Sequence, residues 1–307
     1  MRWVVIGDTG LFGSEMAQLL VERGEEVLRL NRSSLDLEQP SETIATLIGQ
    51  ADVMINAVGY TQVDKAEQDL YEANTVNGIY AGKLADAASL LGAKYFYIST
   101  DYVFDGDASS PYSVNTETAP QSVYGKSKEL GEQLVSQSKA NYTIFRTSWL
   151  YGANGKNFAK TIAARLVDVG AAQIVNDQIG TPTWTRDLAE VVYEHGTNDF
   201  NEKIVHAVAS GYGSWFDFAR EIAAALQSHF PDLVESGPEQ VAYHLAEGGA
   251  EQAAVPHWVK AATRAAARAA HHARRAGGPR RGLCPHHRLP GAGAMDPARR
   301  RERHRRR

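Results

Sequence analysis

Short apolar runs alternate with amphipathic stretches through the first half of the chain. Strand-like runs occupy residues 3–6, 26–30, 52–56, 95–98 and 142–147. Longer stretches with helical spacing of the apolar positions occupy residues 11–23, 73–91 and 122–139. Strands that alternate with helices predict a parallel, doubly wound sheet whose strands end along one edge. The pattern therefore predicts an α/β fold of the Rossmann type, with the ligand crevice at that edge.

Smaller elements are predicted after residue 150. Helical spacing recurs at residues 157–169, 185–195 and 214–226, and residues 204–208 have the composition of another strand. We expect residues 1–150 to form the Rossmann domain and residues 151–241 to form a smaller, interleaved lobe, with a later return of the chain to the sheet. From residue 242 to residue 307 the composition becomes rich in Arg, Ala and Pro, which predicts an atypical tail.

Composition places the chain among ordinary globular proteins. Hydrophobic residues make up 43% of its 307 residues, which is typical of a packed core. No apolar run approaches the roughly 20 residues of a membrane helix, and we expect no signal peptide because a strand starts at the first residues. The single cysteine, Cys284, excludes an internal disulfide and fits a reducing compartment. These features favour the cytoplasm.

A glycine-rich segment lies between the first strand and the first helix. It reads Gly7-Asp8-Thr9-Gly10-Leu11-Phe12-Gly13. Glycines permit a tight turn and a close approach of the backbone to a pyrophosphate, and the helix start offers free N–H groups to phosphates. The alternative is a plain glycine-rich turn, but its position between a strand and a helix favours dinucleotide binding. At the end of the third strand, Ala57, Val58 and Gly59 would line the cofactor.

The end of the second strand indicates which dinucleotide is bound. Sites that prefer NAD usually place an acid there, against the ribose hydroxyls. Here the chain reads Leu30-Asn31-Arg32, and a guanidinium favours a 2′-phosphate. We therefore expect NADPH, and NADH stays open as an alternative cofactor. The other alternative is that Arg32 is simply exposed and binds no ligand. Asp36 and Leu37 follow closely and would flank the adenine.

Two further segments carry candidate catalytic groups. Tyr124 and Lys128 stand four residues apart and would share one helix face. A nearby ammonium favours the phenolate and would lower the pKa of Tyr124, which makes the pair a tunable acid beside a carbonyl. Ser99 and Thr100 end the fourth strand, so their hydroxyls would point into the crevice. The alternatives are a solvated helix face for the pair and local backbone capping for the hydroxyls.

A glycine loop, a Ser/Thr and a YxxxK pair in this order resemble the short-chain dehydrogenase/reductase superfamily. The segment Asn74 to Gly78 resembles the asparagine-bearing helix of its extended, nucleotide-sugar branch. Narrower resemblance to the dTDP-4-dehydrorhamnose reductases lies in residues 56–67, 99–106, 146–152, 177–183 and 213–219. The first two of these segments read NAVGYTQVDKAE and STDYVFDG. The resemblance covers about residues 1–240.

The resemblance implies an enzyme that reduces the C4 carbonyl of dTDP-4-dehydro-β-L-rhamnose with NADPH, in dTDP-rhamnose biosynthesis. Tyr124 would deliver the proton, Lys128 would also hold the nicotinamide ribose, and Thr100 would orient the carbonyl. Asp101 and Trp149 match positions that contact the sugar, with a core aromatic as the alternative for Trp149. Residues 151–241 would then form the substrate-binding lobe. We expect a monomer or homodimer and no resident metal.

Several alternatives stay open at this stage. A related nucleotide-sugar epimerase or dehydratase would keep NAD tightly bound, and Asp101 does not exclude a dehydratase. A non-catalytic regulatory subunit with the reductase fold is the alternative outside enzymes, against which Thr100, Tyr124 and Lys128 argue.

The tail has its own explanations. Residues 260–307 carry fifteen Lys/Arg and two acids, although the net charge of the whole chain is −4. A basic run of this kind suits nucleic acid, and the His271-His272 and Cys284 to His287 clusters suggest a metal, although their spacing fits no closed zinc site. We instead hypothesise a change of reading frame near Ala242 to Leu245. A one-base shift of the codons for residues 250–255 permits Pro-Ser-Arg-Pro-Arg-Tyr, close to the RPxxSxL-like segment with which the family ends. The tail would then be disordered, with no membrane or nucleic-acid partner.

Overall fold

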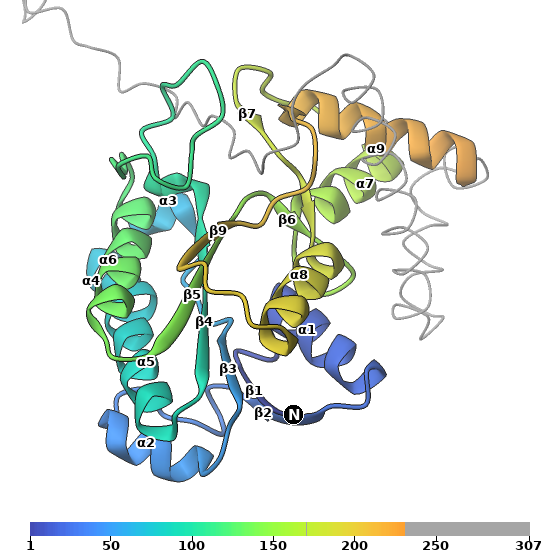
Figure 1. The fold of residues 1–307 in the computed structure, drawn as a ribbon. Helices are drawn as coiled ribbons and strands as arrows, with labels where there is room; N and C mark the ends of the chain where they lie inside the picture. The colour runs from blue at the N-terminus through green and yellow to red at the C-terminus, as the bar shows by residue number, and fades with distance from the viewer. Residues whose placement is uncertain (170, 231–307) are drawn as a thin grey trace, which may run out of the picture.

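The computed structural model describes residues 1–169 and 171–230 (Figure 1). Its main sheet has six parallel strands in the order β2-β1-β3-β4-β5-β9. The strands are β1 (Arg2–Ile6), β2 (Glu26–Leu30), β3 (Val53–Asn56), β4 (Lys94–Thr100), β5 (Asn141–Thr147) and β9 (Ile204–His206). The predicted α/β, doubly wound fold is confirmed. The chain runs from β1 outward to β2 and then crosses to β3 on the other side of β1, so a crevice opens between the ends of β1 and β3.

Helices cover both faces of the sheet (Figure 1). One face carries α2 (Ser41–Ile48), α5 (Tyr80–Leu91) and α6 (Val123–Gln137), which share a core cluster with the strands. The other face carries α1 (Leu11–Glu22) and α8 (Thr185–Thr197), packed over Trp3, Phe96 and Phe145. Strands buried on both faces are apolar throughout, which is why these runs show no alternation in the sequence.

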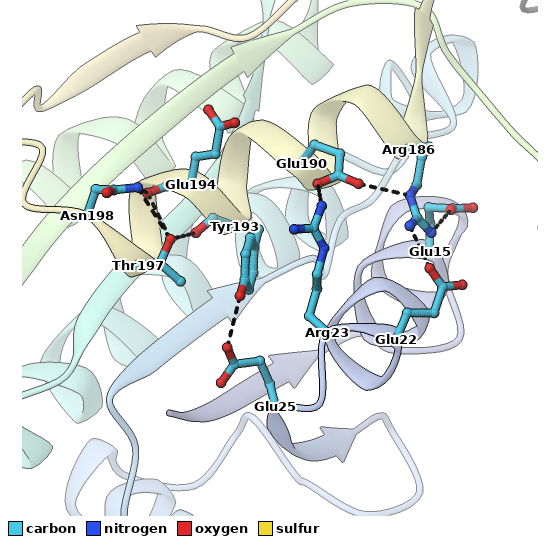
Figure 2. Close-up of polar contacts among 10 residues, drawn as sticks. All are labelled: Glu15, Glu22, Arg23, Glu25, Arg186, Glu190, Tyr193, Glu194, Thr197 and Asn198. Atoms are coloured by element: carbon cyan, nitrogen blue, oxygen red, sulfur yellow. Dashed lines mark hydrogen bonds and ion pairs between the residues drawn. The ribbon is translucent and has the colours of Figure 1, made fainter.

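Ion pairs join α1 to α8 at the surface (Figure 2). Arg186 of α8 binds Glu22 of α1 at 2.5 Å and lies 3.5 Å from Glu15, and Arg23 binds Glu190 at 2.6 Å. These ion pairs join residues that are far apart in the sequence. They hold α8 against α1, the helix that follows the glycine-rich segment.

A smaller lobe stands beside the carboxyl ends of the strands (Figure 1). Its core joins α7 (Phe158–Val169) to α9 (Trp215–His229) through Ile162, Phe218 and Ile222. Short strand pairs brace it: β6 (Leu150–Tyr151) with β8 (Thr183–Trp184), and β7 (Ile179–Gly180) with β10 (Gly213–Ser214). Ser214 begins α9 with a capping box, because its hydroxyl accepts from the Asp217 N–H and the Asp217 carboxylate accepts from the Ser214 N–H.

One predicted helix is more complex than its pattern suggested. The stretch expected as a single helix over residues 73–91 consists of α4 (Leu70–Asn74), a π-helical turn (Thr75–Ile79) and α5. The turn carries Asn77, whose side chain binds the backbone of Tyr60 and the hydroxyl of Ser127. A local widening of this kind often marks a functional site.

Other elements were not predicted at all. These are α2, the short helix α3 (Val63–Ala66), a 3₁₀ turn (Asp101–Val103) and the two-residue strands of the lobe. The domain boundary at residue 150 stays a prediction, although the structure returns residues 185–206 to the sheet as α8 and β9. The tail expected at residues 242–307 lies outside the described residues. No helix in the described part of the chain is long and apolar enough to cross a membrane.

Candidate active site

The glycine loop lies at the crevice between β1 and β3. Gly7 has φ +92°, and a Cβ there would lie 2.8 Å from the carbonyl carbon of Ala57. A Cβ at Gly13 would lie 2.2 Å from the Gly7 oxygen. Both positions therefore require glycine, the first also because its backbone is left-handed. The close approach brings the start of α1, with its free N–H groups, to the edge of the crevice.

Asp8 ties this loop to the end of β2. Its carboxylate accepts from Nε of Arg29 and from Nδ2 of Asn31, both at 3.0 Å, and Asp8 is only 6% exposed. The Gly7 N–H donates to the Leu30 oxygen at 2.7 Å. These hydrogen bonds hold the loop in one conformation without a ligand, which lowers the entropy cost of binding a phosphate there.

A cleft of about 760 Å³ continues from the loop along the ends of β1, β2 and β3. The predicted cofactor residues that line it are Gly7, Gly10, Arg32, Asp36, Leu37, Ala57, Val58 and Gly59. Leu11, Phe12 and Gly13 do not line it. Phe12 lies in the core with Trp3 and Met16, so any contribution it makes to a ligand comes from its backbone. The residues present fit an NADPH molecule, because a glycine-walled phosphate site and an exposed guanidinium share one cleft.

Sequence reasoning missed half of the cleft wall. The additional lining residues are Ile6, Thr9, Asn31, Ser33, Leu35, Glu38, Glu72, Val76 and Tyr80. Asn31 and Ser33 flank Arg32 and could have been inferred from their position. Glu72, Val76 and Tyr80 come from the α4–α5 segment, whose approach to the cleft has no signal in the sequence.

Lys128 of α6 lies beside Gly59, although neither it nor Tyr124 is among the residues that line the cleft. It is 5% exposed, and its ammonium donates to the Ile98 oxygen at 2.9 Å and lies 4.9 Å from the centre of the Tyr97 ring. A Cβ added at Gly59 would lie 3.5 Å from Nζ, so the lysine stands directly beside the cleft residues. Burial lowers the pKa of Lys128 to about 8, and the charge of Glu132 acts in the opposite direction.

Tyr124 and Thr100 meet one helical turn away. Ser122 caps α6 by accepting from the Gly125 N–H at 3.0 Å, which sets Tyr124 in the first turn. Burial raises the pKa of Tyr124 to about 12, a hydrogen bond with the Thr100 hydroxyl opposes this, and the charge of Asp101 adds to it. The Thr100 hydroxyl donates to the Asp101 carboxylate at 3.0 Å. The structure therefore brings Thr100, Asp101, Tyr124 and Lys128 together.

Two details of the sequence interpretation were wrong. The pKa of Tyr124 was expected to lie below its usual value, but in the structure burial of the phenol raises it. Ser99 was expected to point into the crevice, but its hydroxyl donates to the buried carboxylate of Glu132 at 2.5 Å. Successive residues of a strand point to opposite faces, so Ser99 and Thr100 cannot both face the ligand. Thr100 also shows the predicted capping alternative, since it accepts from the Tyr102 N–H.

Trp149 stands two residues beyond the end of β5, where Thr147 is in register with Thr100. Its backbone is left-handed, with φ +46°, which is costly for a bulky residue. The indole stacks on Trp215 of α9 with ring centres 3.4 Å apart, and a Cβ at Gly180 would overlap it. The stack links the end of β5 to the lobe, so Trp149 is an aromatic packing residue in the structure, and its contact with a sugar stays a prediction.

Comparison with known proteins gives a consistent family match. The model of a family described as the RmlD substrate binding domain matches residues 1–271, which includes part of the tail expected to be atypical. A dTDP-4-dehydrorhamnose reductase of Burkholderia thailandensis is 39% identical over 235 residues, covering 73% of this chain and 78% of that protein. A probable dTDP-4,6-dihydroxy-2-methyloxan-3-one 4-ketoreductase of Streptomyces antibioticus is 37% identical over 237 residues, covering 74% and 78%.

Solved structures agree with these relatives. The crystal structure of a dTDP-4-dehydrorhamnose reductase from Bacillus anthracis in complex with NADP has a TM-score of 0.68 and 34% identity, over 73% of this chain and 80% of that one. An orthologue from Clostridium acetobutylicum has a TM-score of 0.67 and 37% identity over the same shares.

Proposed function

The chain belongs to the RmlD substrate binding domain family, and from this we propose that it is an NADPH-dependent reductase of the C4 carbonyl of dTDP-4-dehydro-β-L-rhamnose, yielding dTDP-β-L-rhamnose. The observation that carries the proposal is the meeting of Thr100, Tyr124 and Lys128 beside a glycine-walled cleft. The presence of Thr100, Tyr124 and Lys128 argues against a regulatory subunit, and Arg32 in the cleft, which suits NADPH, argues against an epimerase or dehydratase that keeps NAD bound.

The residues have complementary tasks in this reaction. NADPH, when bound, supplies the hydride for the carbonyl carbon. Tyr124 gives its phenolic proton to the carbonyl oxygen, and a pKa of about 12 keeps it protonated, as an acid must be, at neutral pH. Thr100 orients the same oxygen by hydrogen bonding. Lys128 stabilises the phenolate left on Tyr124 and binds the nicotinamide ribose.

The cleft and the lobe would divide the two ligands between them. Arg32 would face the 2′-phosphate of NADPH, since it lines the cleft at the end of β2. Asp101 and Trp149 would contact the sugar from the strand ends. The dTDP portion would then extend toward residues 151–241, the proposed substrate-binding lobe.

Location and assembly follow as part of the same proposal. The single cysteine, which fits a reducing compartment, supports the proposal of a cytoplasmic enzyme. A monomer or a homodimer is proposed, and light scattering of the purified protein would distinguish these two states.

The test is NADPH oxidation with dTDP-4-dehydrorhamnose, using the parent chain and Tyr124→Phe. Removing the proton donor should lower kcat by about 10²–10⁴-fold while NADPH affinity is kept. Tyr71→Phe is the matched control, because Tyr71 is 81% exposed on α4, and it should react like the parent. If the parent binds NADPH but leaves this sugar unreduced, the substrate assignment is wrong, and turnover of another dTDP-4-keto sugar would point to the Streptomyces relative's type of substrate.

A further inference from the structure

A buried ion pair lies directly behind the proposed catalytic group. Nε and Nη2 of Arg146 on β5 donate to the carboxylate of Glu132 on α6, with distances of 3.0 and 2.6 Å to its two oxygens. The two side chains are 4% and 7% exposed. Ser99 on β4 donates to the same carboxylate at 2.5 Å. Three donors on one buried carboxylate hold it in a single position.

Glu132 is placed to act on Lys128. Tyr124, Lys128 and Glu132 follow one another at intervals of four residues on α6, so they form one row on one helix face. Both Lys128 and Glu132 are 5% exposed, and water therefore screens their interaction only weakly. The charge of Glu132 raises the pKa of Lys128 against the lowering that burial causes.

The other groups around Lys128 do not replace this carboxylate. Tyr97 of β4 presents its ring face to the ammonium, and the π-helical turn contributes the neutral amide of Asn77 nearby. Behind these groups, Arg146 of β5 faces Glu132 rather than the lysine, and Asp101 acts on Tyr124. Among the described residues, Glu132 is the group whose charge raises the pKa of Lys128.

The proposed reaction needs a charged lysine at one particular moment. When Tyr124 releases its proton, a phenolate forms in a buried place, and only a nearby cation offsets the cost of that charge. A neutral lysine would leave the phenolate unsupported and would bind the ribose hydroxyls more weakly. Burial alone favours the neutral lysine, so the site requires a counter-charge.

We propose that Glu132 is a positioning residue that gives Lys128 a buried counter-charge for proton transfer from Tyr124, and that Arg146 and Ser99 hold the Glu132 carboxylate in place for this task. The inference rests on the proposed reductase function for the proton-transfer step. It also makes a statement about NADPH binding alone, because Lys128 would hold the nicotinamide ribose in its charged form.

The test is the pH dependence of kcat/KM and, separately, of NADPH affinity. In Glu132→Gln the amide keeps an acceptor for Arg146 and Ser99, but the charge is gone. The basic limb of both profiles, at which Lys128 loses its proton, should move to lower pH by about one unit. A purely structural role would lower stability or kcat at every pH and leave the position of this limb unchanged.

A second variant covers the case in which Glu132→Gln does not fold. Glu132→Leu combined with Arg146→Met removes both members of the Arg146–Glu132 pair, and such exchanges are often neutral for stability. Its basic limb should move in the same direction. The matched control is Arg23→Met combined with Glu190→Leu, which removes a pair of the same 2.6 Å length between α1 and α8, and its limb should stay with that of the parent.

The outcomes separate the two proposals. The role of Glu132 is overturned if the folded Glu132 variants keep the parent's basic limb in both pH profiles, that of kcat/KM and that of NADPH affinity.

The parent protein can also fail to reduce the sugar. If the basic limb of its NADPH-affinity profile still moves when Glu132 is replaced, the proposed substrate is wrong and the positioning role is supported.

Discussion

Two clusters of arginine and glutamate occupy opposite environments in this protein. Arg146 and Glu132 lie behind the proposed catalytic group, and their side chains are 4% and 7% exposed. Arg186, Arg23 and Glu190 lie between α1 and α8, where their side chains are 22%, 45% and 34% exposed (Figure 2). The shortest contact is 2.6 Å both in the buried pair and between Arg23 and Glu190. Distance therefore does not distinguish the clusters, and burial does.

The difference shows where a charge pair affects the ionisation of its neighbours. At the surface, water and salt screen the attraction, and such pairs typically contribute 0.2–1 kcal/mol. Arg186 lowers the pKa of the exposed Glu22 by hydrogen bonding, a local effect. In the interior the pair itself costs desolvation, but its members act on every neighbouring ionisable group. The buried cluster is thus suited to setting protonation states, and the surface cluster to fixing one helix on another.

Breaking the buried pair should have the largest effect. Arg146→Met leaves Glu132 as a buried carboxylate without its cation, and the free energy of unfolding should fall by about 3–5 kcal/mol. Urea denaturation at neutral pH measures this loss. The same substitution at Arg23 is the matched comparison, and equal losses at the two positions would show that burial does not separate the clusters.

Lowering the pH should destabilise the buried cluster through His206, which lies beside Arg146 in the sheet. Burial, together with the charge of Arg146, lowers the pKa of His206 to about 4. The unfolded chain then binds more protons between about pH 6.5 and 4, so stability is full above pH 6.5 and is lost as the pH falls to 4, by about 3 kcal/mol. His206→Leu should flatten this part of the stability profile.

The His206 experiment compares unfolding midpoints across that pH range. Neither ring nitrogen of His206 has a hydrogen-bond partner among residues 1–169 and 171–230, so leucine removes no direct bond seen there. Parallel pH profiles for the parent and His206→Leu would mean that His206 gains its proton without penalty and that its surroundings are not desolvated.

The surface cluster should give the smallest effect. Arg186→Met removes contacts to Glu22, Glu190 and Glu15 but leaves carboxylates that are mostly near water. We expect a loss of about 1 kcal/mol at low ionic strength that shrinks at high salt. Thermal melts in low and high salt measure it, and a loss that salt does not change would place Arg186 with the buried cluster instead.

Much of the frame of the site was accessible from the sequence. The order of strands and helices located Gly7, Arg32 and Ala57 at strand ends, and parallel strands bring their ends to one edge. Tyr124 and Lys128 were found because four-residue spacing on a helix is a local property. Each of these inferences uses only neighbours along the chain.

What was missed depends on contacts between distant segments. Glu132 carried no signal, since its partner Arg146 lies across a helix–strand contact whose register the sequence does not show. The raised pKa of Tyr124 likewise comes from burial, which depends on the whole packed site. Two-residue strands such as β6 and β8 are too short for a hydrophobic period to reveal them.

The π-helical turn at Thr75–Ile79 has a consequence for chain length. One wide turn takes up one residue more than the same stretch of regular helix would hold, and each residue of a regular helix turns the faces that follow by about 100°. Deleting a residue here would therefore rotate either α4 or α5 about its axis, and Tyr80 and Glu72 could no longer both face the cleft. For protein engineers, an insertion or deletion in this short stretch changes which face of a whole helix points to the cleft. A substitution there changes only the contacts of the replaced side chain.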